Sequence, residues 1–323
     1  MLLIMARATS FRRGIAASDA TSRRLSRVSD LSRPGRGMVE HALLEGLTLA
    51  LTPDDGAKQG LGLWTLGLAA ARWASSLPGQ RVCRGARVLE LGSGVGLAGL
   101  ACGIAAAEVT LTDYEDDVLA QLRRHVALNL PRLRPGVCVR VAKLDWDAAA
   151  AAEGSSGGSA SSSSSVATPE PEPEPEPEPD AVASIRPGHR PFDVVLGADV
   201  CYSGMSCVPD LFDDDPPAGP EESEGRAWDN SANVAETLSW CMARPGGVAH
   251  LFVHGGRSPD EVSRFSARAA ELGMTVATEP LPAELLAPPL SSGAGEAAGC
   301  WHEYAEEEGL AMLVVRWRPC SDR

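Results

Sequence analysis

The sequence lacks the patterns that would place it in several common protein classes. No apolar run reaches the ~18 residues that a membrane-spanning helix requires, so we expect no membrane partner. The eight cysteines include no C-x-x-C pair and no metal-like cluster with the six histidines, which favours a reducing compartment and no metal site. Basic residues are also scarce. With 29 Lys and Arg against 43 Asp and Glu, a net charge of −14 argues against nucleic-acid binding through a broad basic face.

Two stretches look unable to contribute to a hydrophobic core. Residues 1–38 are rich in Arg, Ser and Ala, a composition typical of an organelle transit peptide or of a disordered basic arm. Residues 149–188 begin with Ala, Gly and Ser and continue with alternating Pro and Glu, which favours extended polyproline II. We therefore predict one domain, residues 39–323, interrupted by this low-complexity insertion. We expect a cytoplasmic monomer, or a mitochondrial or plastid protein if residues 1–38 act as a transit peptide.

The ordered part of the chain is organised around residues 88–97, VLELGSGVGL. A short apolar run ends in glycines and passes into a helix-compatible segment, which predicts the first strand–turn–helix unit of a nucleotide-binding α/β sheet. The spacing is G-x-G-x-G, whereas the dinucleotide pattern would place its third glycine at Leu97. Glu90, two residues before the first glycine, suits a ligand that carries an ammonium group better than one that carries a pyrophosphate. This pattern favours S-adenosylmethionine over a nicotinamide dinucleotide.

Two further candidate positions lie near predicted strand and helix ends. Asp113 closes a predicted strand, residues 108–113, at the place where a doubly wound fold holds the carboxylate that grips ribose hydroxyls. The alternative for Asp113 is an N-cap of the next predicted helix, residues 116–129. Trp64 stands before a predicted helix, residues 65–77, which Pro78-Gly79 should stop. We expect Trp64 either to cover the cofactor or to pack in the core.

The following strands end in a similar way. Asp145 and Trp146 come after the third predicted strand, residues 137–141, where they suit hydrogen bonding to and stacking on an adenine, or form a surface loop. The fourth strand, residues 194–196, runs out into Asp199 and Tyr202. The chain then continues with a helix, a strand, a helix and two strands, which we predict at residues 231–242, 248–253, 259–272, 274–278 and 311–317.

Four short stretches make the chain resemble the seven-β-strand protein-lysine methyltransferases of the methyltransferase-like family. They are Leu63-Trp64, residues 88–97, Leu144-Asp145-Trp146, and residues 199–202, which fit the D-x-x-Y signature. The resemblance implies a class I methyltransferase fold. This is a Rossmann-like α/β architecture with a seven-stranded, mostly parallel sheet, helices on both faces and a C-terminal antiparallel hairpin.

The resemblance also implies an activity, which is S-adenosylmethionine-dependent methylation of a lysine side chain in a protein substrate. Asp199 and Tyr202 would border the channel of the acceptor amine and are the predicted catalytic residues. The predicted cofactor residues combine Glu90, Gly96 and Asp145 from the patterns above with those that the resemblance adds, which are Trp64, Gly92, Ser93, Gly94, Asp113, Trp146 and Ala198.

Several alternatives stay open at this point. Another acceptor, such as a small-molecule amine, a protein N-terminus or a histidine, would use the same cofactor motifs. A non-catalytic binding protein of the same fold would also keep them. The acidic segments 149–185 and 209–230 leave the predicted sheet near the channel, so they either favour a basic protein as the partner or only keep the protein soluble.

Overall fold

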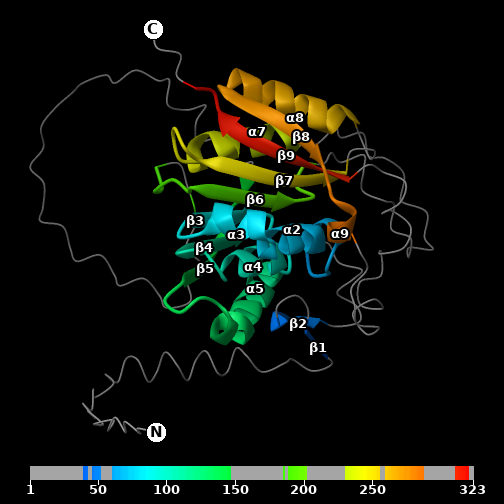
Figure 1. The fold of residues 1–323 in the computed structure, drawn as a ribbon, viewed down its shortest axis with the longest axis vertical. Helices are drawn as coiled ribbons and strands as arrows, with labels where there is room; N and C mark the ends of the chain where they lie inside the picture. Colours follow the sequence, from blue (N-terminus) through cyan, green and yellow to red (C-terminus); the bar gives the residue numbers. More distant parts are fainter. Residues whose placement is uncertain are drawn as a thin grey trace, which may run out of the picture.

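Seven strands form one mixed sheet in the computed structural model, in the order β5-β4-β3-β6-β7-β9-β8 (Figure 1). The structure describes residues 39–42, 46–51, 60–146, 185, 188–201, 230–254, 259–286 and 310–319. The strands are β3 (Arg87–Leu91), β4 (Glu108–Asp113), β5 (Cys138–Lys143), β6 (Val194–Ala198), β7 (Val248–His254), β8 (Met274–Pro280) and β9 (Leu310–Trp317).

The sheet has a parallel part and an antiparallel end. Strands β5, β4, β3, β6 and β7 run parallel, whereas β9 pairs antiparallel with both β7 and β8. Successive strands leave β3 first toward β4 and β5 and later, on the other side, toward β6 and β7. The strand order therefore reverses between β3 and β6, which is where open α/β sheets bind ligands. The predicted fold class, including the antiparallel C-terminal strands, is confirmed.

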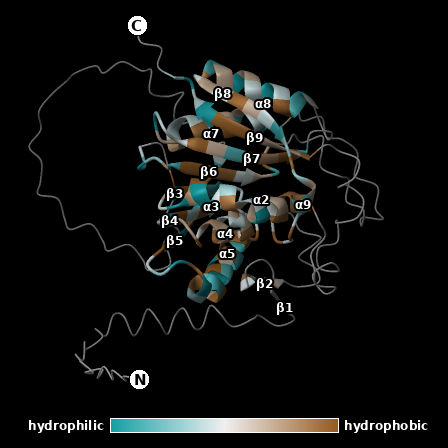
Figure 2. Ribbon diagram, in the orientation of Figure 1, coloured by the Kyte–Doolittle hydropathy of each residue, from teal (hydrophilic) through white to brown (hydrophobic). Residues whose placement is uncertain are grey.

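Helices cover both faces of the sheet. One face packs against α2 (Thr65–Ser75), α3 (Leu77–Cys83), α4 (Leu97–Cys102) and α5 (Asp116–Asn129). The other face packs against α7 (Asn230–Cys241) and α8 (Pro259–Glu271). Alternate residues of each strand point to opposite faces, so a strand buried on both faces is apolar throughout. Figure 2 shows this as hydrophobic colour along β6, β7 and β9. None of the described helices is long and apolar enough to cross a membrane.

The helix predicted for residues 65–77 ends two residues early, and a second helix follows it. Helix α2 ends at Ser75, and α3 begins at Leu77 and includes Pro78-Gly79, which was expected to stop the first helix. The Ser76 side chain caps the second helix by accepting a hydrogen bond from Gly79 N at 3.3 Å. Proline is tolerated in the first turn because its missing N–H would have no partner there. The Pro-Gly pair therefore lies in the first turn of α3 and is not what ends α2.

The N-terminal segment adds an element that the sequence did not predict. Strands β1 (Val39–Ala42) and β2 (Thr48–Leu51) form an antiparallel ribbon, and β2 lies against α5. We call residues 39–42 and 46–51 the N-terminal ribbon. Leu47 and Leu49 are fully buried in the same core as α2, α4 and α5. The ribbon is thus part of the domain.

Part of the predicted insertion also belongs to the core. Ile185 is buried, and its N donates a hydrogen bond to Lys143 O at 3.1 Å. The expectation that residues 149–188 bury nothing is therefore wrong at Ile185. Most of that segment, together with the arm at residues 1–38, lies outside the described residues, and their roles stay predictions.

Candidate functional site

The glycine loop, residues 92–96, joins β3 to α4 at the carboxyl edge of the sheet. All three of its glycines have positive φ, with 52° at Gly92, 49° at Gly94 and 76° at Gly96. Side chains rarely adopt this left-handed region, whereas glycine does so readily. A Cβ on Gly96 would also lie 2.5 Å from Leu122 Cδ2 in α5. Each glycine of the predicted motif is therefore required by the backbone.

Three distant segments meet the glycine loop. A Cβ on Gly92 would lie 3.2 Å from both the Trp146 ring, which follows β5, and the Val200 side chain, which follows β6. A Cβ on Gly94 would lie 3.1 Å from the carbonyl oxygen of Gly60, just before α2. The Trp146 Nε1 atom is buried and has no hydrogen-bond partner among the described residues. A bare backbone cradle beside an unused indole N–H is a chemically suitable place for a heteroaromatic ligand.

Asp113 ends β4 and holds the glycine loop from the side. Its Oδ2 accepts a hydrogen bond from Gly94 N at 3.0 Å, and its Oδ1 accepts one from Tyr114 N at 2.8 Å. Burial raises the pKa of this carboxyl, and the backbone hydrogen bonds act against that rise. The N-cap position of α5 is Glu115, so the capping alternative does not describe Asp113. Oδ1 also accepts a hydrogen bond from Glu115 N at 3.4 Å, so Oδ2 is the oxygen that keeps a second lone pair for a ligand hydroxyl.

Glu90 lies under α4 and is only 4% exposed. Burial raises the pKa of its carboxyl to about 8, and the Ser93 hydroxyl partly offsets this rise. A Cβ on Gly99 would lie 2.6 Å from Glu90 Oε2, so the glycine inside α4 makes room for the carboxyl group. At pH 7 the carboxyl is mainly neutral, whereas the prediction from the sequence relied on its negative charge. The role of Glu90 toward a ligand stays a prediction.

Ser93 is used mainly to hold the loop. Its Oγ accepts a hydrogen bond from Thr112 N at 2.9 Å, and its own N donates to Thr112 O at 2.7 Å. These bonds continue the β3–β4 pairing into the glycine loop. Thr112 therefore fixes the loop, although nothing in the sequence pattern singled it out.

The end of β6 carries a strained residue. Asp199 has a φ of 58°, the only positive φ at a non-glycine residue in the described part of the chain. Its N donates to Phe252 O on β7 at 2.9 Å, which helps to hold this conformation. Left-handed backbone at such a residue costs about 1–2 kcal/mol, and strain of this kind concentrates at functional sites. Ala198, the last residue of β6, is half-buried, and Tyr202 lies outside the described residues.

Aromatic side chains stand exposed around this edge. Trp64, the N-cap residue of α2, is 37% exposed, so it is not an ordinary core tryptophan. Asp145 is exposed beside the half-buried Trp146. Tyr114 directly follows Asp113 and is 51% exposed, and it was not among the predicted site residues. Its position after a strand-ending acid is the signal that would have found it.

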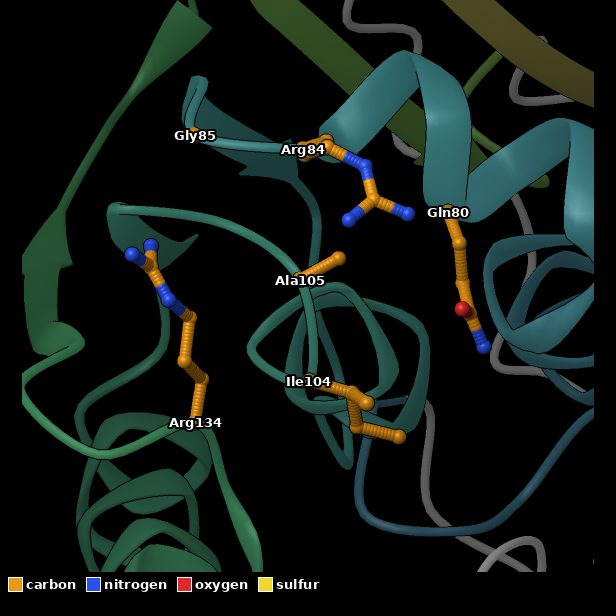
Figure 3. A pocket seen from close by; sticks show the side chains of 6 residues that line it. All are labelled: Gln80, Arg84, Gly85, Ile104, Ala105 and Arg134. Carbon is orange, nitrogen blue, oxygen red and sulfur yellow. The ribbon is translucent and has the colours of Figure 1, made fainter.

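A separate cavity of about 440 Å³ opens at the other edge of the sheet (Figure 3). Its walls come from the connections that precede β3, β4 and β5, and the lining residues are Gln80, Arg84, Gly85, Ile104, Ala105 and Arg134. This cavity is therefore remote from the glycine loop. This cavity is not part of the candidate site, which the side chains and backbone geometry around the glycine loop define.

Comparison with known families supports the resemblance. Residues 43–158 match the family model described as lysine methyltransferase. The human protein-lysine N-methyltransferase EEF2KMT is 40% identical over 99 residues, which cover 28% of this chain and 29% of that protein. The mouse EEF1A lysine methyltransferase 3 is 33% identical over 108 residues, which cover 31% of this chain and 42% of that protein. The match therefore spans less than half the length of these curated relatives.

Solved structures of methyltransferases match this chain at low identity and with TM-scores below 0.5. A methyltransferase from Pyrococcus furiosus is 15% identical, with a TM-score of 0.42, and the match covers 93% of this chain and 98% of that one. A SAM-dependent methyltransferase from Agrobacterium tumefaciens is 13% identical, with a TM-score of 0.43, and the match covers 88% and 70% of the two chains. The fold assignment itself rests on the strand order.

Proposed function

We propose that this chain is an S-adenosylmethionine-dependent protein-lysine N-methyltransferase. The main support is a convergence at one edge of the sheet. Four features lie at the carboxyl ends of neighbouring strands of the sheet. The glycine loop follows β3, Asp113 ends β4, Trp146 comes after β5, and Asp199 follows β6. The match of residues 43–158 to lysine methyltransferases supports the same activity.

The residues at this edge fit the cofactor. The glycine loop permits close approach of a ligand to the backbone. Asp113 has acceptor capacity left for ribose hydroxyls, and Trp146 offers a ring for stacking and an unused N–H for an adenine nitrogen. Trp64, which is exposed at the start of α2, would cover the ligand. When bound, the cofactor supplies an electrophilic methyl group on a sulfonium centre.

The protein must also present a neutral amine. A lysine of pKa ~10.4 is mostly protonated near pH 7, and freeing its lone pair costs about 4–5 kcal/mol. A channel that partly excludes water lowers this cost, because desolvation disfavours the ammonium form. Asp199 would accept a hydrogen bond from the amine and hold the nitrogen in line with the methyl group of the cofactor. The proton that the lysine ammonium loses passes to water. We propose the same role for Tyr202, which lies outside the described residues.

The proposed substrate is a basic protein. The net charge of −14 supports this choice, because an acidic enzyme attracts a basic partner at low ionic strength. We also propose that the enzyme acts as a cytoplasmic monomer.

Labelled S-adenosylmethionine incubated with the protein and a cell lysate tests the activity. A labelled protein band is expected, with the label on lysine after hydrolysis. Label in small molecules would indicate another acceptor class. Tight cofactor binding without any transfer would contradict an enzymatic role.

A matched pair of variants tests the assignment of Asp199. Asp199→Asn removes the charge but tolerates the left-handed backbone, so the loop should keep its shape. We expect turnover to fall about a hundredfold or more while S-adenosylhomocysteine affinity stays within a few-fold, because the loss concerns the acceptor. Asp193→Asn is the control, because Asp193 precedes the amino end of β6 whereas Asp199 follows its carboxyl end. This substitution should leave turnover within a few-fold. Equal turnover in both variants would remove Asp199 from the mechanism.

A further inference from the structure

Helix α5 carries a row of buried polar side chains. Gln121, His125 and Asn129 stand four residues apart, so they lie on one face of the helix. Their exposed fractions are 4%, 0% and 0%. Buried polar groups destabilise a fold unless they are hydrogen-bonded, and each of these three bonds to main-chain atoms outside α5. We call these residues the polar row.

Two members of the polar row bind the outer edge of β2. Asn129 Oδ1 accepts from Thr48 N, and Asn129 Nδ2 donates to Thr48 O, both at 2.7 Å, which copies the pairing between two peptide groups. His125 Nε2 accepts from Ala50 N at 3.1 Å. Four helix residues rise about 6 Å and two strand residues about 6.6 Å, so the two spacings match. The N-terminal ribbon is therefore held in register on α5.

His125 also reaches the glycine loop. Its Nδ1 lies 2.8 Å from Val95 O. Nε2 lies 3.1 Å from Ala50 N and 3.2 Å from Ala50 O. A carbonyl oxygen only accepts, so the hydrogen bond to Val95 O requires the proton on Nδ1, and Nε2 of the neutral ring then accepts from Ala50 N. Gln121 donates a hydrogen bond to Leu61 O at 3.1 Å. Leu61 follows Gly60, whose carbonyl oxygen faces Gly94. One helix face thus joins the N-terminal ribbon and the segment before α2 to the glycine loop.

We propose that the polar row couples docking of the N-terminal ribbon to the conformation of the glycine loop, with His125 as the positioning residue. The proposal rests on the proposed function, because it names a determinant of cofactor affinity. Coupling between two sites is reciprocal, so a docked ribbon raises cofactor affinity and bound cofactor stabilises the docked ribbon. Asn129 bonds to the ribbon and His125 bonds to both parts, so His125 is the link.

A double-mutant cycle on S-adenosylhomocysteine binding, measured by calorimetry, tests the coupling. Asn129→Ala is expected to weaken binding by about three- to tenfold, although its hydrogen bonds go only to the ribbon and to α5 itself. In the His125→Leu background the same substitution should change affinity by less than about twofold, since the link is already broken. A folded Asn129→Ala protein with wild-type affinity would overturn the proposal, as would equal losses in both backgrounds.

A variant on the ribbon side covers the case in which Asn129→Ala does not fold. Ala50→Pro removes the N–H that donates to His125 and puts a ring carbon in place of that hydrogen, so the ribbon cannot keep its contact with His125, and proline is tolerated at a strand edge. It should weaken S-adenosylhomocysteine binding to a similar extent, and only while His125 is present. Unchanged affinity in a folded Ala50→Pro protein would count against the coupling.

Hydrogen exchange without any ligand separates this proposal from the proposed function. The Gly94 and Gly96 amides donate to Asp113 Oδ2 and Ser93 O, so their exchange reports the shape of the loop. Asn129→Ala should speed exchange of both amides about fivefold or more in wild type but not in the His125→Leu background. If the wild type fails to bind S-adenosylhomocysteine, the proposed function fails while this cycle still decides the coupling. Unchanged loop exchange in folded Asn129→Ala would overturn the coupling.

Discussion

The carboxylates at the two ends of strand β4 have pKa values shifted in opposite directions. At the amino end, Glu108 lies between Arg87 and Arg140 at 3.0 and 3.1 Å. Burial alone would raise the pKa of Glu108, but the Arg87 hydrogen bond and the arginine charges outweigh it and hold the pKa below its usual value. At the carboxyl end, burial dominates and raises the pKa of Asp113 and, on β3 beside it, of Glu90. The amino end is neutralised for stability, whereas the carboxyl end keeps uncompensated groups beside the proposed ligand site.

The largest expected effect is on the free energy of unfolding as a function of pH, compared between Glu90→Gln and Glu108→Gln. The folded state raises the pKa of Glu90 to about 8, so its stabilising contribution is complete below pH ~4.5 and is lost as pH rises through 8. Glu90→Gln should therefore abolish much of the stability loss between pH 5 and pH 8.5, on the order of 4 kcal/mol as an upper value. Urea unfolding at the two pH values measures this difference.

Glu108→Gln serves as the opposite case. Because the folded state lowers the pKa of Glu108, its contribution is present above pH ~4.5 and is lost as pH falls through the folded value. This substitution should therefore destabilise the protein at pH 8.5, where Glu90→Gln stabilises it. Effects of the same sign at that pH would break the comparison between the two ends.

The sequence predicted best where a pattern is local. The bounds of β4 and α5 were predicted correctly. The apolar run of β4 ends in Asp113, and the acids Asp116 and Asp117 mark the first turn of α5. The glycine loop was also predicted correctly, because only glycine suits the positive φ that the turn requires. The split between α2 and α3 was missed, since Pro78-Gly79 marks a stop as readily as a new start.

The sequence could not predict features that depend on distant packing. The N-terminal ribbon has strands of only four residues and is held by side chains of α5 far along the chain. The burial of Glu90 depends on the room that Gly99 leaves for it under α4. Asp199 was singled out from the sequence, but its strained backbone is visible only in the structure.

An intermediate effect is expected from two Gly→Ala substitutions. Gly96, at the carboxyl edge, and Gly136, before β5, both have positive φ. A Cβ on Gly136 would meet no described atom within 4 Å, so Gly136→Ala should cost only the backbone strain, about 1–2 kcal/mol. Gly96→Ala should cost about 1–3 kcal/mol more, because Leu122 must move out of the way. Thermal and urea unfolding of both variants measure the difference, and equal losses would show that α5 does not restrain the loop.

The smallest effect is expected from shortening the insertion at the carboxyl end of β5. The described chain reaches Trp146 and is described again at Ile185, whose N bonds to Lys143 O at the end of β5. Both ends of the intervening segment therefore lie at the same place, and a short Gly-Ser bridge can replace residues 149–183. Loop length affects stability only weakly, by about 0.6 kcal/mol per doubling, so the melting temperature should stay within a few degrees.

A longer deletion provides the contrast. Removing residues 149–188 also removes Ile185, which is buried in the core on the α7 and α8 face of the sheet, and should cost about 1.5–3 kcal/mol from the lost apolar burial. Ile185→Ala in the full chain should reproduce most of that loss, which separates the side chain from the loop. S-adenosylhomocysteine affinity should be the same for the shorter deletion and the wild type, since the glycine loop and Asp113 are untouched. If the shorter deletion lowers the melting temperature as much as the longer one, the insertion packs on the domain and the boundary drawn at Ile185 is wrong.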